Sequence, residues 1–167
     1  SPTFANLNAV RLIAENDGWA VGDGGNIFKL IAEDTTISWA HYETLPSAVN
    51  LYGLHMRNSS DGWAVGAAPS ATFPPTILRW NGAAWTVVTP SGVALGQRLR
   101  AVDTVSPRVS WAVGSAATGL PALILIWDGT LWASVPSGTP NNAELLSVDM
   151  ISSTDGWAVG CVDFPTC

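Results

Sequence analysis

Residues 59–66 read SSDGWAVG, and the core of this stretch occurs four times in the chain. The other copies are NDGWAVG at 16–22, SWAVG at 110–114 and TDGWAVG at 154–160. The copies are 44, 48 and 46 residues apart when they are aligned on their tryptophans, Trp19, Trp63, Trp111 and Trp157. A leucine stands twelve residues before each tryptophan, at Leu7, Leu51, Leu99 and Leu145. Four matches at a constant offset indicate an internal repeat of about 46 residues.

Each repeat reads as a series of short strands. The leucine opens a first strand, a turn follows that is Asp-Gly in three copies, and WAVG is the second strand. Third strands are predicted at 26–30, 76–80 and 123–127. Asn81-Gly82 and Asp128-Gly129 then predict tight hairpin turns into a fourth strand, because both dipeptides tolerate positive φ.

Four antiparallel strands per repeat, with no helical periodicity, predict an all-β fold, a β-propeller. The strand count gives three complete blades and half of a fourth. The whole chain is predicted to be one propeller or partial propeller domain, with blades at about 5–48, 49–93, 97–139 and 143–167.

The repeated tryptophans are predicted to be core residues. Side chains alternate across a strand, so Trp and Val of WAVG face one neighbouring blade while Ala and Gly face the other. A blade that is apolar on both faces cannot stand alone, which explains why the same short strand recurs. We therefore place Trp19, Trp63, Trp111 and Trp157 between blades rather than in a ligand site.

The composition excludes some functions. Seven basic and thirteen acidic residues give a net charge of −6, which argues against binding to nucleic acid or to an anionic membrane. No apolar run is long enough for a transmembrane span. Charged residues make up 12% of the chain, about half the usual share, so the surface is expected to be neutral and polar or covered by partners, sugars or other copies.

The pattern DGWAVG…ILRWNGAAW resembles the GWAVG-type β-propeller repeats of the sialidase-like/BNR superfamily. Similar repeats occur in the photosystem II assembly factor family and in secreted bacterial repeat proteins. The resemblance covers essentially the whole chain and implies the fold rather than an activity. Sialidase chemistry would need the Asp box Ser-x-Asp-x-Gly-x-x-Trp, whereas residues 127–132 read WDGTLW, and neither an arginine triad nor a tyrosine nucleophile is found. We expect no catalysis, no cofactor and no metal.

The recurring Asp17, Asp61 and Asp155 are typical of turn residues, and a calcium site is the weaker interpretation. Two cysteines supply only half of the four ligands that zinc needs, which argues against a zinc site at Cys161 and Cys167. The two cysteines are therefore predicted to form a disulfide, with two free thiols as the alternative. The loops after WAVG at 67–76 and 115–122 are the expected functional surface. Candidate glycosylation sites are Asn58, Ser70, Thr72, Thr76 and Thr118.

The half blade is expected to leave an open edge, and open edges pair with other strands. The sequence leaves three alternatives: further blades in a longer chain, association of several copies, or a monomer that tolerates the incomplete blade. The chain is accordingly predicted to be an extracellular or cell-surface structural subunit that assembles with itself into a ring or filament. The alternative is a module that recognises a protein or a glycan through loops on one face, and a glycosidase fragment is a third, weaker hypothesis.

Overall fold

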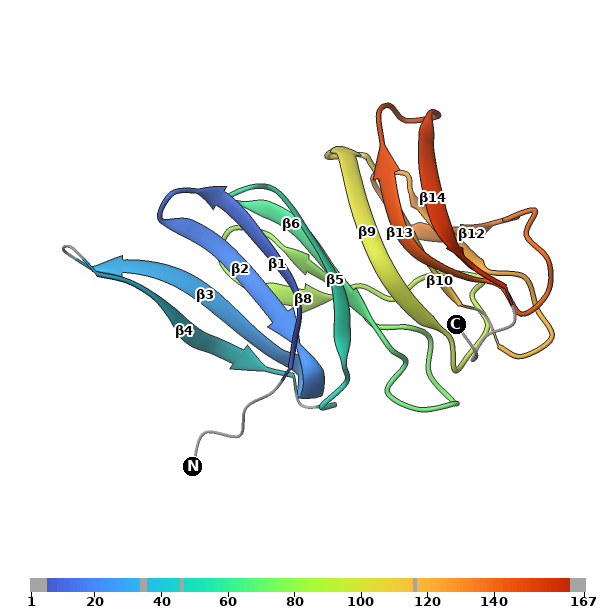
Figure 1. The fold of residues 1–167 in the computed structure, drawn as a ribbon, viewed down its shortest axis with the longest axis horizontal. Helices are drawn as coiled ribbons and strands as arrows, with labels where there is room; N and C mark the ends of the chain where they lie inside the picture. The colour runs from blue at the N-terminus through green and yellow to red at the C-terminus, as the bar shows by residue number, and fades with distance from the viewer. Residues whose placement is uncertain (1–5, 34–35, 46, 116, 163–167) are drawn as a thin grey trace.

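The computed structural model describes residues 6–33, 36–45, 47–115 and 117–162, which fold into successive antiparallel sheets (Figure 1). The first sheet contains β1 (Leu7–Ala14), β2 (Asp17–Gly22), β3 (Asn26–Glu33) and β4 (Thr36–Thr44). The second contains β5 (Leu51–Asn58), β6 (Asp61–Gly66), β7 (Ile77–Trp80) and β8 (Trp85–Val87). The third contains β9 (Arg98–Ser106), β10 (Val109–Ser115), β11 (Leu123–Trp127) and β12 (Trp132–Val135).

The last described strands, β13 (Glu144–Met150) and β14 (Gly156–Cys161), form a two-stranded ribbon. The ribbon joins the third sheet through the residue pair Ser115–Glu144 at the end of β10. The predicted fold class, an all-β propeller with three complete blades and half of a fourth, is confirmed. We call the four units blade 1 to blade 4.

The first strand of each blade lies beside the first strand of the next, with β5 between β1 and β9, and β9 between β5 and β13. Figure 1 shows the blades fanning out from this row. Helical structure in the described residues is limited to the three-residue turn η1 (Asp23–Gly25), so this part of the chain has no helix that could cross a membrane.

Glycine ends every WAVG strand because the backbone of the preceding strand comes too close for a side chain. A Cβ added to Gly22, Gly66, Gly114 or Gly160 would overlap the carbonyl oxygen of the residue just before the repeated leucine. The first strand has a register irregularity at this point in each blade, typical of a β-bulge. The repeat therefore requires glycine here because of a contact within the blade, with the first strand, and not because of the expected contact with a neighbouring blade.

Two turn predictions are wrong in detail. The Asp-Gly pairs at Asp17 and Asp61 begin the second strand, and the turn is formed by the two preceding residues. The Asn81-Gly82 sequence lies in a four-residue connection between Trp80 and Trp85 rather than in a two-residue turn. The Asn81 side chain closes this loop because its Oδ1 accepts the backbone N–H groups of residues 83 and 84.

Candidate functional site

The core lies between blades and is built from unlike faces. One face of each blade carries the Trp and Val of WAVG, and we call it the tryptophan face. The other carries the Ala of WAVG and the aromatic residues on either side of the turn between the third and fourth strands, and we call it the alanine face. The tryptophan face of blade 1 packs on the alanine face of blade 2, and blades 2 and 3 repeat this arrangement.

Each buried repeat tryptophan contacts a pair of tryptophans from the next blade. The ring centroid of Trp19 lies 4.6 Å from that of Trp80 and 5.4 Å from that of Trp85. Trp63 lies 5.0 Å from Trp127 and 5.1 Å from Trp132 in the same way. Both repeat tryptophans are 1% exposed. The β7–β8 and β11–β12 hairpins therefore each deliver two aromatic rings to the preceding blade.

Trp111 and Trp157 differ from the first two copies. Trp111 is half-buried, and Trp157 is 74% exposed, so Trp157 departs from the prediction that all four are core residues. The physical reason is that a repeat tryptophan is covered by the next blade's hairpin. Among the described residues no hairpin follows β14, so blade 4 covers Trp111 with two strands only and nothing covers Trp157.

A groove of about 220 Å³ marks the uncovered part of the blade 3 tryptophan face. Trp111, Val113 and Ile124 form one side of it. The ribbon of blade 4 forms the other side with Val148, Met150, Gly156 and Ala158. In the described chain β14 is the edge strand of its sheet.

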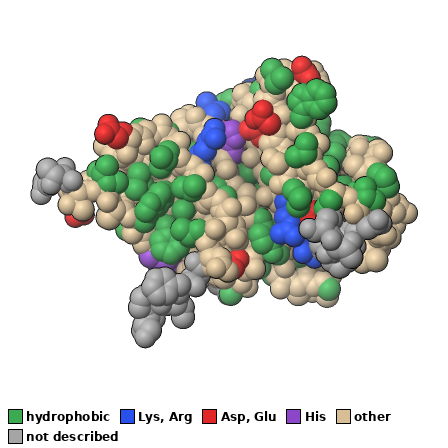
Figure 2. All heavy atoms as spheres, in the orientation of Figure 1, with side chains coloured by type: hydrophobic (Ala, Val, Ile, Leu, Met, Phe, Trp, Pro, Cys, Tyr) green, Lys and Arg blue, Asp and Glu red, His purple; other side chains and the backbone are tan. Residues whose placement is uncertain are grey.

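The opposite end of the array exposes an alanine face. Val10 and Leu12 on β1 are 61% and 59% exposed, and Trp39 on β4 is 41% exposed. Trp39 pairs with Leu30 as Trp85 pairs with Trp80, so it occupies the same place in its blade as a hairpin tryptophan. Figure 2 shows hydrophobic side chains gathered over the first sheet. Unlike faces are therefore exposed at the two ends of the array.

The repeated aspartates form ion pairs with the third strand. Asp61 accepts from Arg79 at 3.3 Å (Nη2–Oδ1) and from Arg57 at 2.8 Å (Nε–Oδ2), and Asp17 pairs with Lys29. The guanidinium of Arg79 also lies over the Trp63 ring, 5.0 Å from its centroid, and the ammonium of Lys29 lies 4.6 Å from that of Trp19.

In blade 3 the position of the aspartate is Val109, and the position opposite Trp111 is Ile126. Blade 3 thus has neither the acidic nor the basic residue of this pair. The structure corrects the turn interpretation of Asp17 and Asp61, since both side chains bind a basic residue that covers the repeat tryptophan. No group of three potential metal ligands occurs among the described residues.

A second set of polar contacts joins the first strands of neighbouring blades. Nδ1 of His55 on β5 lies 2.6 Å from Oδ1 of Asp103 on β9, and the backbone N–H of Met150 on β13 donates to Oδ2 of Asp103 at 2.7 Å. Burial raises the pKa of Asp103, but the hydrogen bonds from His55 and Met150 outweigh it and leave the pKa below its ordinary value. One carboxylate thereby ties three blades together.

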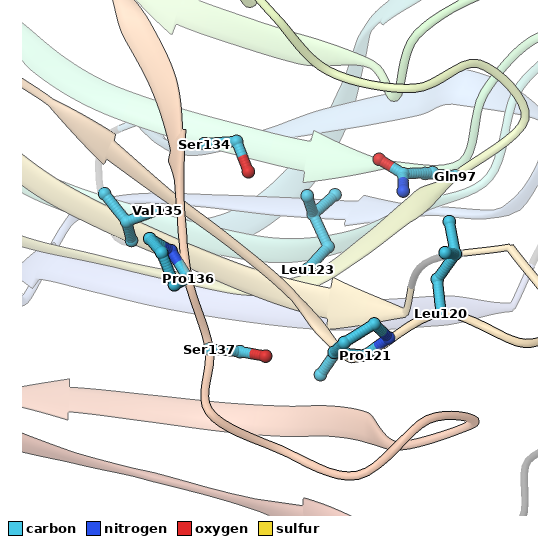
Figure 3. Close-up of a pocket in the computed structure, with 9 residues that line it drawn as sticks. Gln97, Leu120, Pro121, Leu123, Ser134, Val135, Pro136 and Ser137 are labelled. Carbon is cyan, nitrogen blue, oxygen red and sulfur yellow. The ribbon is translucent and has the colours of Figure 1, made fainter.

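A pocket of about 370 Å³ opens beside the loop between β10 and β11 (Figure 3). Leu120, Pro121 and Leu123 line it, together with residues 134–137, which are the end of β12 and the two residues after it. Gln97 also lines it; its side chain is 5% exposed, and its Oε1 has no hydrogen-bond partner among the described residues. A similar apolar pocket of about 330 Å³ lies at the matching place in blade 2, beside Phe73. The loops predicted to be functional therefore border repeated apolar pockets.

The candidate modification sites divide by exposure. Ser70, Thr72 and Thr118 are exposed, and Asn58 is half-buried at the end of β5. Thr76 is 8% exposed at the start of the third strand, so it is a poor acceptor for a sugar, which corrects its candidacy. Cys161 ends β14, but Cys167 lies outside the described residues, so the disulfide stays a prediction.

Sequence reasoning missed Lys29, Arg79, His55 and Asp103. The signal for the first two was present, because blades 1 and 2 each have Asp before Gly-Trp and a basic residue on the third strand opposite the tryptophan. The contact of His55 with Asp103 joins residues 48 positions apart on different blades, and no local pattern indicates it.

Solved structures of YCF48 are among those that resemble the chain. "YCF48 bound to D1 peptide" matches with a TM-score of 0.68 and 18% identity, over 97% of this chain and 48% of that one. "YCF48 from Cyanidioschyzon merolae" matches with a TM-score of 0.65 and 14% identity, over 93% of this chain and 48% of that one. The chain thus spans about half the length of these propellers, and at such identity the likeness shows the fold. No protein-family model matches the sequence, and no curated protein matches it.

Proposed function

We propose that this chain is a non-catalytic protein-association module that assembles with further copies of itself. The observation that carries the proposal is that the two ends of the array expose different and complementary faces. Blade 1 exposes an alanine face around Val10 and Leu12, whereas blade 4 exposes a tryptophan face with Trp157 74% and Val159 61% exposed. Within the chain, these are the two kinds of face that pack against each other.

Contact of unlike faces is heterologous, so it closes into a ring or continues as a filament. Each contact would remove large apolar side chains from water, and burial of such side chains contributes about 1.5–3 kcal/mol apiece. An extracellular or cell-surface location belongs to the same proposal and is supported by the low share of charged residues and the cysteine pair near the end of the sequence.

The mass of the native particle tests this function. We would measure light scattering and sedimentation of the full chain over a hundredfold range of concentration. We expect a mass that is a multiple of 17.5 kDa, and we expect Leu12→Asp and Trp157→Asp each to return it to the monomer. Leu95→Asp is the matched control, because Leu95 is an exposed apolar residue (52%) in a loop away from both end faces. A particle of 17.5 kDa at every concentration would overturn the proposal.

Recognition of a different protein through the loops is the second candidate. It is favoured by the equivalent apolar pockets beside Leu120 and Phe73 at the same end of blades 2 and 3. A similar propeller has been solved bound to a peptide, which favours a protein ligand over a glycan. Panning a random peptide library and a glycan array against the full chain separates these ligands, and Leu120→Asp should abolish peptide binding. Binding only to glycans would contradict this candidate.

A further inference from the structure

The pocket beside Gln97 occurs in two copies that are built from equivalent residues. Residues 120–123 and 134–137 line it in blade 3. Residues 73–76 and 87–90 hold the same positions of the repeat in blade 2, and they line the pocket there. Each copy lies between the loop that follows WAVG and the end of the fourth strand. The walls are therefore internal segments of four-stranded blades, and the repeat itself builds the pocket.

Gln97 is the residue that distinguishes the two copies. It lines the pocket of blade 3, whereas the additional lining residue in blade 2 is Pro69. Gln97 stands two residues before the repeated leucine, where blade 2 has Val49 and blade 4 has Ala143. All three side chains are 5% exposed, and Val49 and Ala143 belong to hydrophobic clusters. The repeat thus fills this position with an apolar residue elsewhere, and packing does not explain a carboxamide in blade 3.

The side-chain oxygen of Gln97 is a buried acceptor without a donor. Its Oε1 has no hydrogen-bond partner among the described residues. Figure 3 shows the carboxamide pointing toward Leu123 and Ser134, which line the same pocket. A buried acceptor that is left unpaired destabilises a fold, because it has lost its hydrogen bond to water. A ligand that enters the pocket and donates to this oxygen would remove the penalty.

The chemistry of the walls limits the kind of ligand. None of the described residues that line the pocket carries a charge. The polar side chains besides Gln97 are the hydroxyls of Ser134 and Ser137, and Pro121 and Pro136 have no backbone N–H to offer. The pocket therefore favours an uncharged, apolar group that brings its own N–H.

We propose that this pocket binds an extended peptide segment of a partner protein, which inserts one uncharged apolar side chain and donates an adjacent backbone N–H to Oε1 of Gln97. A peptide offers this combination because every residue except proline carries an N–H next to its side chain. The volume of about 370 Å³ lies in the range of ligand sites, about 300–1,000 Å³. The copy in blade 2 has no buried acceptor in this place, so it should not discriminate between ligands with and without the N–H.

This inference rests on the second candidate function, recognition of a different protein through the loops, and identifies the chemistry of its ligand. It does not involve the end faces of the array. Peptide binding that is lost in Leu120→Asp but insensitive to Gln97 would leave loop recognition in place and overturn the role of Gln97. The particle mass, measured on the same samples, reports on self-association separately.

Three capped peptides are the probe. The parent is acetyl-Ala-Leu-Ala-amide, and in each of two analogues one of the amides that flank the leucine is replaced by an ester, which removes a single N–H. We would titrate the full 167-residue chain with each peptide and follow the side-chain NH₂ signals of Gln97 by nuclear magnetic resonance. We expect saturable shifts with the parent peptide. One of the two esters should bind about tenfold more weakly, the order expected for one buried hydrogen bond that is not made.

Gln97→Val is the matched variant, because it introduces the residue that blade 2 has at this position. The backbone amide signals around the pocket report its binding. It should bind the amide and both ester peptides with equal affinity. It should also raise the urea midpoint of the free chain, because it removes an unpaired buried acceptor. A carboxamide with a merely structural role would give the opposite change in the midpoint.

Four results would overturn the proposal. They are no shift at any peptide concentration, equal affinity of the parent chain for the amide and both esters, shifts confined to the blade 2 pocket around Phe73, and a lower urea midpoint for Gln97→Val. The ester comparison uses the unmodified chain, so it remains decisive if the variant fails to fold.

Discussion

The guanidinium of Arg79 lies between the carboxylate of Asp61 and the ring of Trp63, 3.3 Å from the carboxylate oxygen and 5.0 Å from the ring centroid. Lys29 stands in the same relation to Asp17 and Trp19 in blade 1. The arrangement joins the second and third strands of a blade and places a cation over the ring of the buried tryptophan. In the third repeat both members of this ion pair are absent, since Val109 and Ile126 occupy their positions.

This pairing predicts that Asp61 and Arg79 are energetically coupled. Asp61→Val should lower the free energy of unfolding by about 1–3 kcal/mol, because it leaves Arg79 without its carboxylate partner. Arg79→Ile should cost less, because Asp61 keeps its ion pair with Arg57. The double variant reproduces blade 3 and should cost less than the sum by about 1 kcal/mol. Urea unfolding of the four proteins measures the coupling, with Arg57→Gln as a control for the second partner of Asp61. A loss of unfolding free energy in the double variant equal to the sum of the two single losses would contradict the coupling.

The bulge glycine predicts a large effect from a single methyl group. In Gly66→Ala the new Cβ would overlap the carbonyl oxygen of Asn50, and backbone atoms cannot move aside as a flexible side chain can. We expect a loss of about 2–3 kcal/mol in the free energy of unfolding. Gly92→Ala is the control: no atom lies within 4 Å of its added Cβ, and its φ of 66° should cost about 1 kcal/mol. Equal losses in urea unfolding would refute the steric explanation.

Asp103 predicts how stability depends on pH. Its pKa is lowered in the folded chain, so its ionised form stabilises the fold above the ordinary aspartate pKa of about 3.9, and this stabilisation is lost as the pH falls through the lower folded value. Asp103→Asn should therefore be less stable than the parent at pH 7 by about 1–3 kcal/mol, and the two should converge below about pH 4.

Thermal unfolding between pH 3 and pH 7 measures this convergence. Asp149→Asn is the matched control, because Asp149 holds the same position on β13 and is exposed. A difference between Asp103→Asn and the parent that is constant with pH would show that the carboxylate charge does not contribute.

The unequal burial of the repeat tryptophans gives the fourth prediction. Trp63→Ala should lower the free energy of unfolding by about 3–5 kcal/mol, because it leaves a cavity in a closed interface. Trp157→Ala should cost no more than about 0.5 kcal/mol in the monomer, as an exposed position does. Guanidinium unfolding at a concentration where the chain is monomeric makes the comparison. A large cost at Trp157 would mean that the tryptophan face of blade 4 is covered in solution.

The strand order and the propeller class could be predicted because they depend on local, repeated information. The spacing of WAVG and its alternation of large and small residues determine which residues form strands and which side each faces. The turn between the third and fourth strands of blade 2 lies where the sequence predicted it, but it has four residues instead of two. The Asn81 side chain closes it with hydrogen bonds that backbone groups make in a two-residue turn. The pocket beside Gln97 could be predicted only as a loop surface, because its walls come from three separate segments.

The sequence by itself therefore determined that four equivalent strands recur and that each blade has two unlike apolar faces. Only the tertiary structure decided which tryptophans are core. Trp19 and Trp157 have the same neighbours in sequence, yet one is 1% exposed and the other 74%. The physical reason is that burial in a propeller comes from the next blade, and a repeat cannot encode the presence of its neighbour.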